Sequence, residues 1–135
     1  MKYPADFTAE LKKKPICGVL SVAMIADVSF EQATQVIKKN LMPHQKRHGG
    51  KTYHEQRCNA LKALGVHYRE IPFAARMTLA RAIAYYCRPG KTYMITTSSH
   101  VVTVRDERVA DQVEIASIKL HGSKRCIARH ILEIV

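Results

Sequence analysis

The chain has 135 residues, of which 47% are hydrophobic and 24% are charged. This composition excludes wholesale disorder and predicts a single globular domain over residues 1–135. The 22 Lys and Arg residues outnumber the 11 Asp and Glu residues, so the formal net charge is +11. The two halves of the chain carry similar shares of this charge, and no nucleic-acid-binding motif accompanies it. An acidic protein partner therefore fits the charge as well as nucleic acid does.

The sequence also indicates where the protein works. Its N-terminus lacks the apolar core of a secretory signal, and its longest weakly polar stretch, residues 18–28, is too short to span a bilayer. The four cysteines are widely spaced and form no C-x-x-C pair, which is unlike a disulfide scaffold. We therefore expect a cytoplasmic protein with reduced thiols and no membrane contact.

The first half of the chain has the periodicity of helices. Apolar side chains recur at helical spacing over residues 19–28 and predict a first helix there. The S-x-x-Q pattern of Ser29–Gln32 is a capping box and predicts a second helix that runs to about Asn40. Proline, paired glycines and few apolar residues predict a loop over residues 43–51.

Two more helices are predicted after this loop. The T-x-x-E pattern of Thr52–Glu55 is a second capping box, and the helix that it begins ends near Gly65. An apolar stripe predicts a fourth helix over residues 78–87, ended by Pro89-Gly90.

From residue 93 onward the pattern changes to β-branched runs that are typical of strands. A tight turn at Asp106-Glu107 separates the second strand from the third. The predicted strands are residues 93–97, 100–104, 108–110, 114–120 and 126–135. Helices followed by antiparallel strands predict an α+β fold.

Cys17 has the sequence surroundings of a reactive cysteine. It lies where a loop gives way to a helix, and helix N-termini and nearby cations favour the thiolate form. Gly18 follows it and leaves room for a substrate, while the only basic run, Lys12–Lys14, precedes it. A nucleophilic thiol also needs a base and a group that orients the base. His100 and Asp111 are the candidates, because adjacent antiparallel strands could bring them together.

Three segments resemble motifs of the papain-like cysteine peptidases, particularly the double-glycine leader peptidase group and its small relatives. Residues 17–24, CGVLSVAM, are similar to the helix start that holds the family's nucleophile. Residues 100–111, HVVTVRDERVAD, are similar to the strand that begins with its base and the strand that ends in Asp. Residues 60–66, ALKALGV, look like an accessory helix of the group. The resemblance spans about residues 15–112, and the three motifs occur in the family's order.

The resemblance implies an α+β papain-like fold, with an N-terminal helical half packed on a C-terminal antiparallel sheet and the site between them. It also implies a hydrolase acting on a peptide or isopeptide amide, without a cofactor or metal. Cys17 would be the nucleophile, His100 the base and Asp111 the residue that orients His100.

The sequence departs from the family at one position. Leu11 stands where the family usually has a glutamine that donates to the oxyanion. The backbone N–H of Cys17, or a lysine among Lys12–Lys14, would have to serve instead. Losing one oxyanion donor costs on the order of 10²–10³ in kcat. The alternative is therefore a catalytically inactive papain-like module that binds an acidic protein or nucleic acid in a bacterial or phage setting.

The remaining cysteines and histidines have less specific surroundings. Cys58, Cys87 and Cys126 lie in apolar patterns, which predicts buried, unreactive thiols. The spacing H-x3-H-x5-H-x3-C, formed by His44, His48, His54 and Cys58, offers zinc ligands but matches no common zinc module. We therefore interpret it as a basic, solvated loop and the opening turn of a helix.

Overall fold

The computed structural model covers residues 1–135 and has four α-helices and six strands. The chain begins with an irregular segment and a short 3₁₀ helix, η1 (Leu11–Lys13). The helices are α1 (Cys17–Ala26), α2 (Phe30–Lys39), α3 (His54–Ala63) and α4 (Leu79–Tyr86). The strands are β1 (Tyr68–Glu70), β2 (Thr92–Thr97), β3 (Val101–Arg105), β4 (Arg108–Ala110), β5 (Ile115–Ser117) and β6 (Ala128–Ile134).

All six strands form one antiparallel sheet in the order β1-β6-β2-β3-β4-β5. The last strand in sequence, β6, lies between β1 and β2, next to the edge strand β1. The tight turn predicted at Asp106-Glu107 joins β3 to β4, and both of its residues have positive φ. The prediction of an α+β fold is confirmed.

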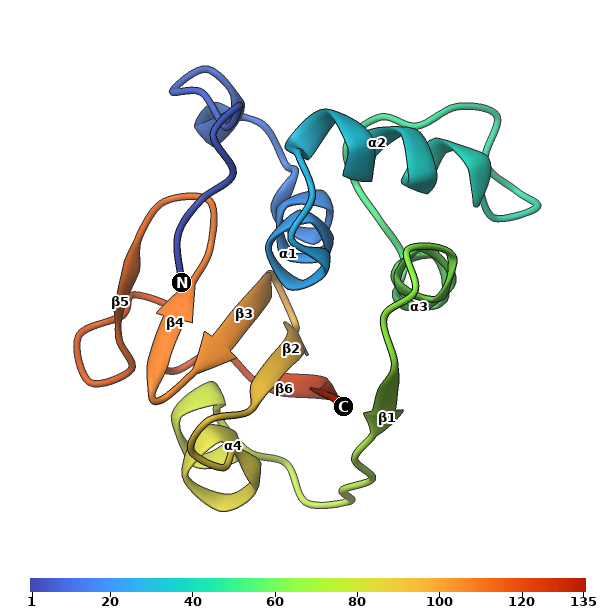
Figure 1. Ribbon diagram of the computed structural model, residues 1–135. Coiled ribbons are helices and arrows are strands. Elements are labelled where there is room, and N and C mark those ends of the chain that lie inside the picture. The colour runs from blue at the N-terminus through green and yellow to red at the C-terminus, as the bar shows by residue number, and fades with distance from the viewer.

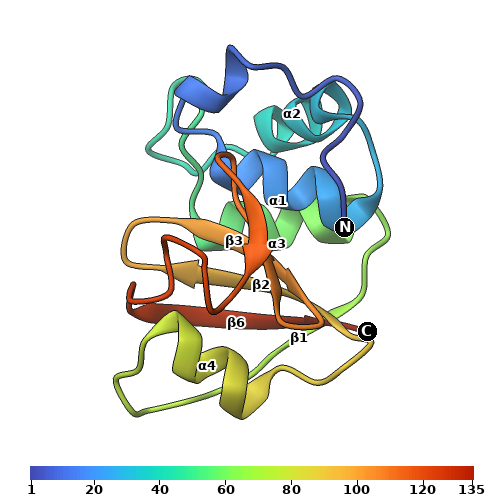
Figure 2. The same ribbon diagram turned by 90° about the vertical axis from the view of Figure 1, so that its left-hand side faces the viewer.

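The helices cover both faces of the sheet (Figures 1 and 2). Helices α1, α2 and α3 share one core with side chains from β2, β3 and β6, whereas α4 packs on the opposite face in a second core. The N-terminal helices thus lie against the sheet as expected. The position of α4 on the far face was not foreseen.

Helix α1 lies between the other helices and the sheet. Five of its ten residues, Val19 to Ala23, are at most 2% exposed, so this helix is buried on nearly all sides. Its one buried hydroxyl, Ser21 Oγ, is 2.8 Å from Thr103 Oγ1 on β3, a hydrogen bond that satisfies both groups. The burial of α1 fixes its first residue, Cys17, relative to the sheet.

Local capping explains where most helices begin. Ser29 Oγ accepts from the N–H of Gln32 at the start of α2, and Thr78 Oγ1 accepts from Arg81 at the start of α4. The capping box predicted at Thr52–Glu55 is wrong by one residue. Helix α3 has Tyr53 as its N-cap, and the Tyr53 N–H donates to Oε1 of Gln56. The Thr52 hydroxyl instead accepts a hydrogen bond from Arg57 of the same helix.

Two strand predictions require correction. The strand expected over 114–120 covers only Ile115–Ser117, because a series of turns begins at residue 118. The short strand β1 was not predicted. Its three residues, Tyr68–Glu70, pair with β6, and their exposed, charged composition gives no local strand pattern.

No helix of the structure has the length and apolar character that crossing a membrane requires.

The irregular N-terminal segment is attached to α2 through Asp6. Its carboxylate accepts from the N–H groups of Phe30 at 2.8 Å and Glu31 at 3.0 Å, two donors that have no partner within the helix. These backbone hydrogen bonds, that of Phe30 above all, lower the pKa of Asp6. Asp6 therefore acts as a second cap of α2, supplied from 24 residues upstream.

We expect Asp6→Ala to lower the free energy of unfolding by about 1 kcal/mol at neutral pH. The folded pKa of Asp6 lies below its unfolded value, so its contribution is full above about pH 5 and is lost as the pH falls through the folded pKa. Urea unfolding of wild type and variant at pH 7 and at about pH 2.5 should therefore show a difference that disappears in acid. Glu10→Ala removes an exposed carboxylate without a hydrogen bond and serves as the control. An Asp6 effect independent of pH would contradict this account.

Candidate active site

Cys17 is the first residue of α1, as the sequence predicts. The N–H groups of Cys17 and Gly18 are at the open end of the helix and donate to no backbone or side-chain acceptor. They are therefore available to an anion, and the helix dipole favours negative charge at the same place. The Cys17 side chain is partly exposed.

Gly18 is required by close packing. A Cβ on Gly18 would overlap Oγ1 of Thr52 and would crowd Cδ of Arg57. The sequence interpretation of Gly18 as room for a substrate is thus incomplete, because part of that room is already taken by the segment that precedes α3. The glycine lets this segment approach the start of α1.

His100 is held at the end of a hairpin. The turn that joins β2 to β3 is organised by Thr97, whose Oγ1 accepts from the N–H of His100 at 2.9 Å and from the N–H of Ser99 at 3.3 Å. The Thr97 N–H in turn donates to the His100 carbonyl at 2.7 Å. The imidazole itself is exposed and makes no hydrogen bond. The backbone of His100 is therefore fixed while its ring stays accessible.

Cys17 and His100 line the same cleft, which has a volume of about 640 Å³. Its walls come from four parts of the fold. These are the start of α1, the segment leading into α3, the β2–β3 turn and the β6 residues Arg129 and His130. The structure thus brings together two of the three residues that the sequence nominated.

The positive charge of the cleft does not come from Lys12–Lys14. These residues do not line the cleft, and the carbonyls of Lys12 and Lys14 are bound by the side chain of Gln112. The cations that line the cleft are Lys51, Arg57 and Arg129. The expectation that Lys12–Lys14 would supply the cations beside the thiol is therefore not met by the cleft lining, and Lys12 Nζ lies instead 5.3 Å from the ring centroid of Tyr3.

Arg57 is the most deeply placed of these cations, with 2% exposure. Its guanidinium donates to the carbonyl and Oγ1 of Thr52 and to Oγ1 of Thr96, and no carboxylate pairs with it. Burial lowers the pKa of Arg57 to about 10, while the thiol groups of Cys17 and Cys58, when ionised, act in the opposite direction. Arg57 is thus a buried positive charge whose nearest countercharge would be a cysteine thiolate.

Asp111 lies outside the cleft and makes no hydrogen bond to His100. Its Oδ1 accepts from the N–H groups of Val113 and Glu114, and its Oδ2 is 3.5 Å from Nε2 of the buried His121. The Ser123 N–H donates to Nδ1 of His121, which leaves the imidazole proton on Nε2, facing Asp111. In this conformation Asp111 holds the loop after β4, and its role in orienting His100 stays a prediction.

The other three cysteines are partly buried and free. Cys58 packs against the core on the α1 side, and Cys87 packs against the core beneath α4. Burial raises the pKa of both thiols, that of Cys87 to about 12. Cys126 belongs to neither core and lies with its Sγ 3.7 Å from Ser99 Oγ. Cys58 and Cys87 therefore have environments that disfavour the thiolate.

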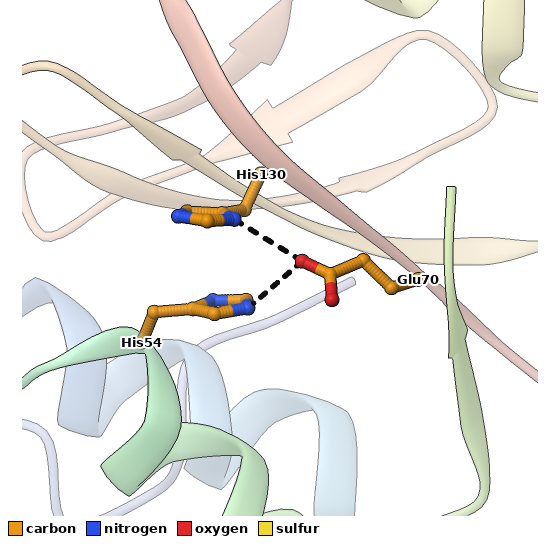
Figure 3. Close-up of side chains that lie close together, drawn as sticks. All are labelled: His54, Glu70 and His130. Carbon is orange, nitrogen blue, oxygen red and sulfur yellow. Dashed lines mark hydrogen bonds and ion pairs between the residues drawn. The ribbon is translucent and has the colours of Figure 1, made fainter. Parts of the chain in front are cut away.

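The histidine-rich spacing noted in the sequence is divided by the fold. His44 packs edge-on against Tyr53, and neither His44 nor His48 joins a cluster of metal-ligating side chains. His54 and Cys58 do lie together on α3, with Nε2 3.7 Å from Sγ. Of these two residues, His54 joins Glu70 of β1 and His130 of β6 in one cluster (Figure 3). Burial, followed by the charge of His130, lowers the pKa of His54.

Sequence reasoning missed Arg57, Arg129 and His130 as cleft residues. Arg57 lies three and four residues before the apolar Ala60 and Leu61, so a charge on the inner face of the helix was the available indication. For Arg129 and His130 no local pattern was available, because β6 reaches the cleft only through its pairing with β2. Comparison of the chain with family models, with curated proteins and with solved structures gives no match.

Proposed function

We propose that the protein is a papain-like cysteine hydrolase that acts on a peptide or isopeptide amide. One observation carries the proposal. Cys17 at the N-terminus of a buried helix and His100 on a rigid turn, 83 residues apart in sequence, line one cleft. A thiol at a helix N-terminus and an accessible imidazole are the two groups that thiol hydrolysis requires.

The proposed reaction has two steps. His100 takes the thiol proton as Cys17 Sγ bonds to the substrate carbonyl carbon, and it then gives that proton to the departing amine as the C–N bond breaks. Water attacks the resulting thioester, with His100 again accepting a proton, and the acid leaves as the Cys17 thiol re-forms. The free N–H of Cys17 would donate to the oxyanion. The buried charge of Arg57 adds to the positive potential in which the oxyanion forms.

The cleft charge favours an acidic substrate. Lys51, Arg57 and Arg129 line the cleft, and no aspartate or glutamate does. A peptide with acidic residues beside the scissile bond would be attracted to this surface. The free cysteines suit a reducing compartment such as the cytoplasm.

The test is the order in which the four cysteines react. We expect iodoacetamide at neutral pH to alkylate Cys17 at least about 10-fold faster than Cys58 or Cys87, because only Cys17 combines exposure with a helix N-terminus. Peptide mass spectrometry over a time course gives the rate at each site. The same experiment in denaturant, where all four thiols should react alike, is the control.

Equal or slower alkylation of Cys17 in the folded protein would overturn the proposal and favour the non-catalytic module. That alternative is supported by the missing oxyanion glutamine, by the absence of Asp111 from the cleft lining and by the basic lining. If the protein is such a non-catalytic module, its ligand binding should persist in Cys17→Ala.

A further inference from the structure

A second group of reactive side chains lies beside the cleft. It consists of His54, Glu70 and His130, with Cys58 next to His54; the ligand atoms of the first three all lie within 4.8 Å of one another. We call these four residues the His54 cluster. They come from three elements, since His54 and Cys58 are one turn apart on α3 while Glu70 belongs to β1 and His130 to β6. The fold alone brings them together.

The geometry of the cluster converges on a single point (Figure 3). His54 Nε2 and His130 Nδ1 lie 3.0 Å and 3.1 Å from the same oxygen, Oε1 of Glu70. The two rings are stacked, with centroids 3.8 Å apart and planes 10° apart. Both imidazoles therefore direct a nitrogen toward one carboxylate oxygen.

Three of the six ligand-to-ligand distances are close to those around a tetrahedral zinc ion. Zinc bonds of about 2.0–2.1 Å to nitrogen and oxygen place such ligands about 3.3 Å apart, and a bond of about 2.3 Å to sulfur places nitrogen and sulfur about 3.6 Å apart. The corresponding distances here are 3.0–3.1 Å, and 3.7 Å between His54 Nε2 and Cys58 Sγ. To admit the ion, the two stacked rings would have to turn so that both nitrogen lone pairs face it, and Cys58 Sγ would have to move in beside them.

The chemistry of the cluster agrees with its spacing. Imidazole, carboxylate and thiolate are the ligand types that zinc takes in proteins, and a thiolate excludes hard cations such as magnesium. One carboxylate and one thiolate with two neutral imidazoles would balance the charge of a divalent ion. We propose that His54, Glu70 and His130 bind a zinc ion, with Cys58 as its fourth ligand.

This site would connect α3 to the β1 edge of the sheet. Strand β1 has only three residues and is held through its pairing with β6. Four protein ligands make a closed, structural zinc site. Because His54 and His130 also line the cleft, the ion would fix the part of the cleft wall that these two residues form. The inference is independent of Cys17 chemistry.

The test uses zinc itself in a Cys17→Ala background, because a thiol and an imidazole in the cleft could bind the ion by themselves. We expect isothermal titration to show one zinc ion per chain. We expect Glu70→Gln and His130→Ala each to weaken binding by about 100-fold or more, since loss of even an outer-shell partner costs about 10–100-fold. His67→Ala, which removes an exposed histidine without a side-chain hydrogen bond, should bind as the background does. Circular dichroism verifies that each variant is folded.

Cobalt(II) in place of zinc tests the fourth ligand. A tetrahedral site with a thiolate gives intense visible bands and a sulfur-to-cobalt charge-transfer band, and Cys58→Ser should remove the latter. Zinc binding that is absent, or equal in Glu70→Gln and the background, would overturn the proposal. A tetrahedral cobalt spectrum that is unchanged in Cys58→Ser would overturn the assignment of Cys58. Either result leaves the alkylation test of Cys17 unaffected, so failure of the metal site and failure of the hydrolase can be told apart.

Discussion

His100→Ala should fold like the wild type and yet acylate Cys17 about 10²–10⁴-fold more slowly, the contribution expected of a general base. The imidazole is exposed and makes no hydrogen bond, so its removal leaves no unpaired buried group. The measurement is the burst of nitrophenolate released from p-nitrophenyl acetate, which reports acylation without knowledge of the natural substrate. Urea unfolding of the same preparations shows whether stability has changed.

Two variants control this experiment. Cys17→Ala should lose the burst entirely, which shows that the reaction occurs at that thiol and not at Cys126, the other cysteine near the β2–β3 turn. His67→Ala removes an exposed histidine away from the cleft and should keep the wild-type burst. A burst in His100→Ala as fast as in wild type would remove His100 from the mechanism, even if Cys17 remained the most reactive cysteine.

Asp111→Ala should lower the free energy of unfolding by about 1–3 kcal/mol, the cost of leaving buried donors without an acceptor. The carboxylate is 7% exposed, and its Oδ1 accepts from the N–H groups of Val113 and Glu114. Its loss would leave these two backbone donors unpaired and would remove the neighbour of the buried His121 ring. Urea or thermal unfolding measures the effect.

Asp111→Asn is the matched variant, because an amide oxygen can still accept from the two backbone N–H groups. It should cost less than Asp111→Ala. The acylation burst of the folded Asn variant then addresses the predicted orienting role. A rate close to wild type contradicts that role, whereas a fall of about 10-fold or more with little loss of stability would support it. A negligible stability loss in Asp111→Ala would contradict the contacts described here.

Local sequence patterns predicted most of the helices because capping and periodicity depend on near neighbours. Ser29 and Thr78 cap α2 and α4 with their own side chains, as short sequence patterns indicate. The prediction of Thr52 as an N-cap from the local pattern was wrong. Thr52 has the pattern of a cap, but its Oγ1 is bound by Arg57, so the helix begins one residue later. A hydrogen bond from a buried charge of the helix itself replaced the capping hydrogen bond that the pattern predicts.

For the candidate site, the sequence identified Cys17 and His100 and the structure placed both in one cleft. The sequence analysis predicted the wrong cations for the cleft, because it took Lys12–Lys14, which are close to Cys17 in sequence, to be close to it in space. Gln112 binds the carbonyls of Lys12 and Lys14, while Arg57 and Arg129 reach the cleft from α3 and β6.

The amino-acid sequence by itself determined the α+β class, the four helices, the β3–β4 hairpin and the two candidate groups of the proposed reaction. These follow from short-range periodicity, capping and turn preferences. Only the tertiary structure decided that α4 packs on the far face, that Asp111 faces His121 and that His54, Glu70 and His130 meet. Those outcomes depend on which distant segments pack together, such as the insertion of β6 between β1 and β2. Such packing depends on how side chains from the whole chain fit together in the core, and no short stretch of sequence specifies that fit.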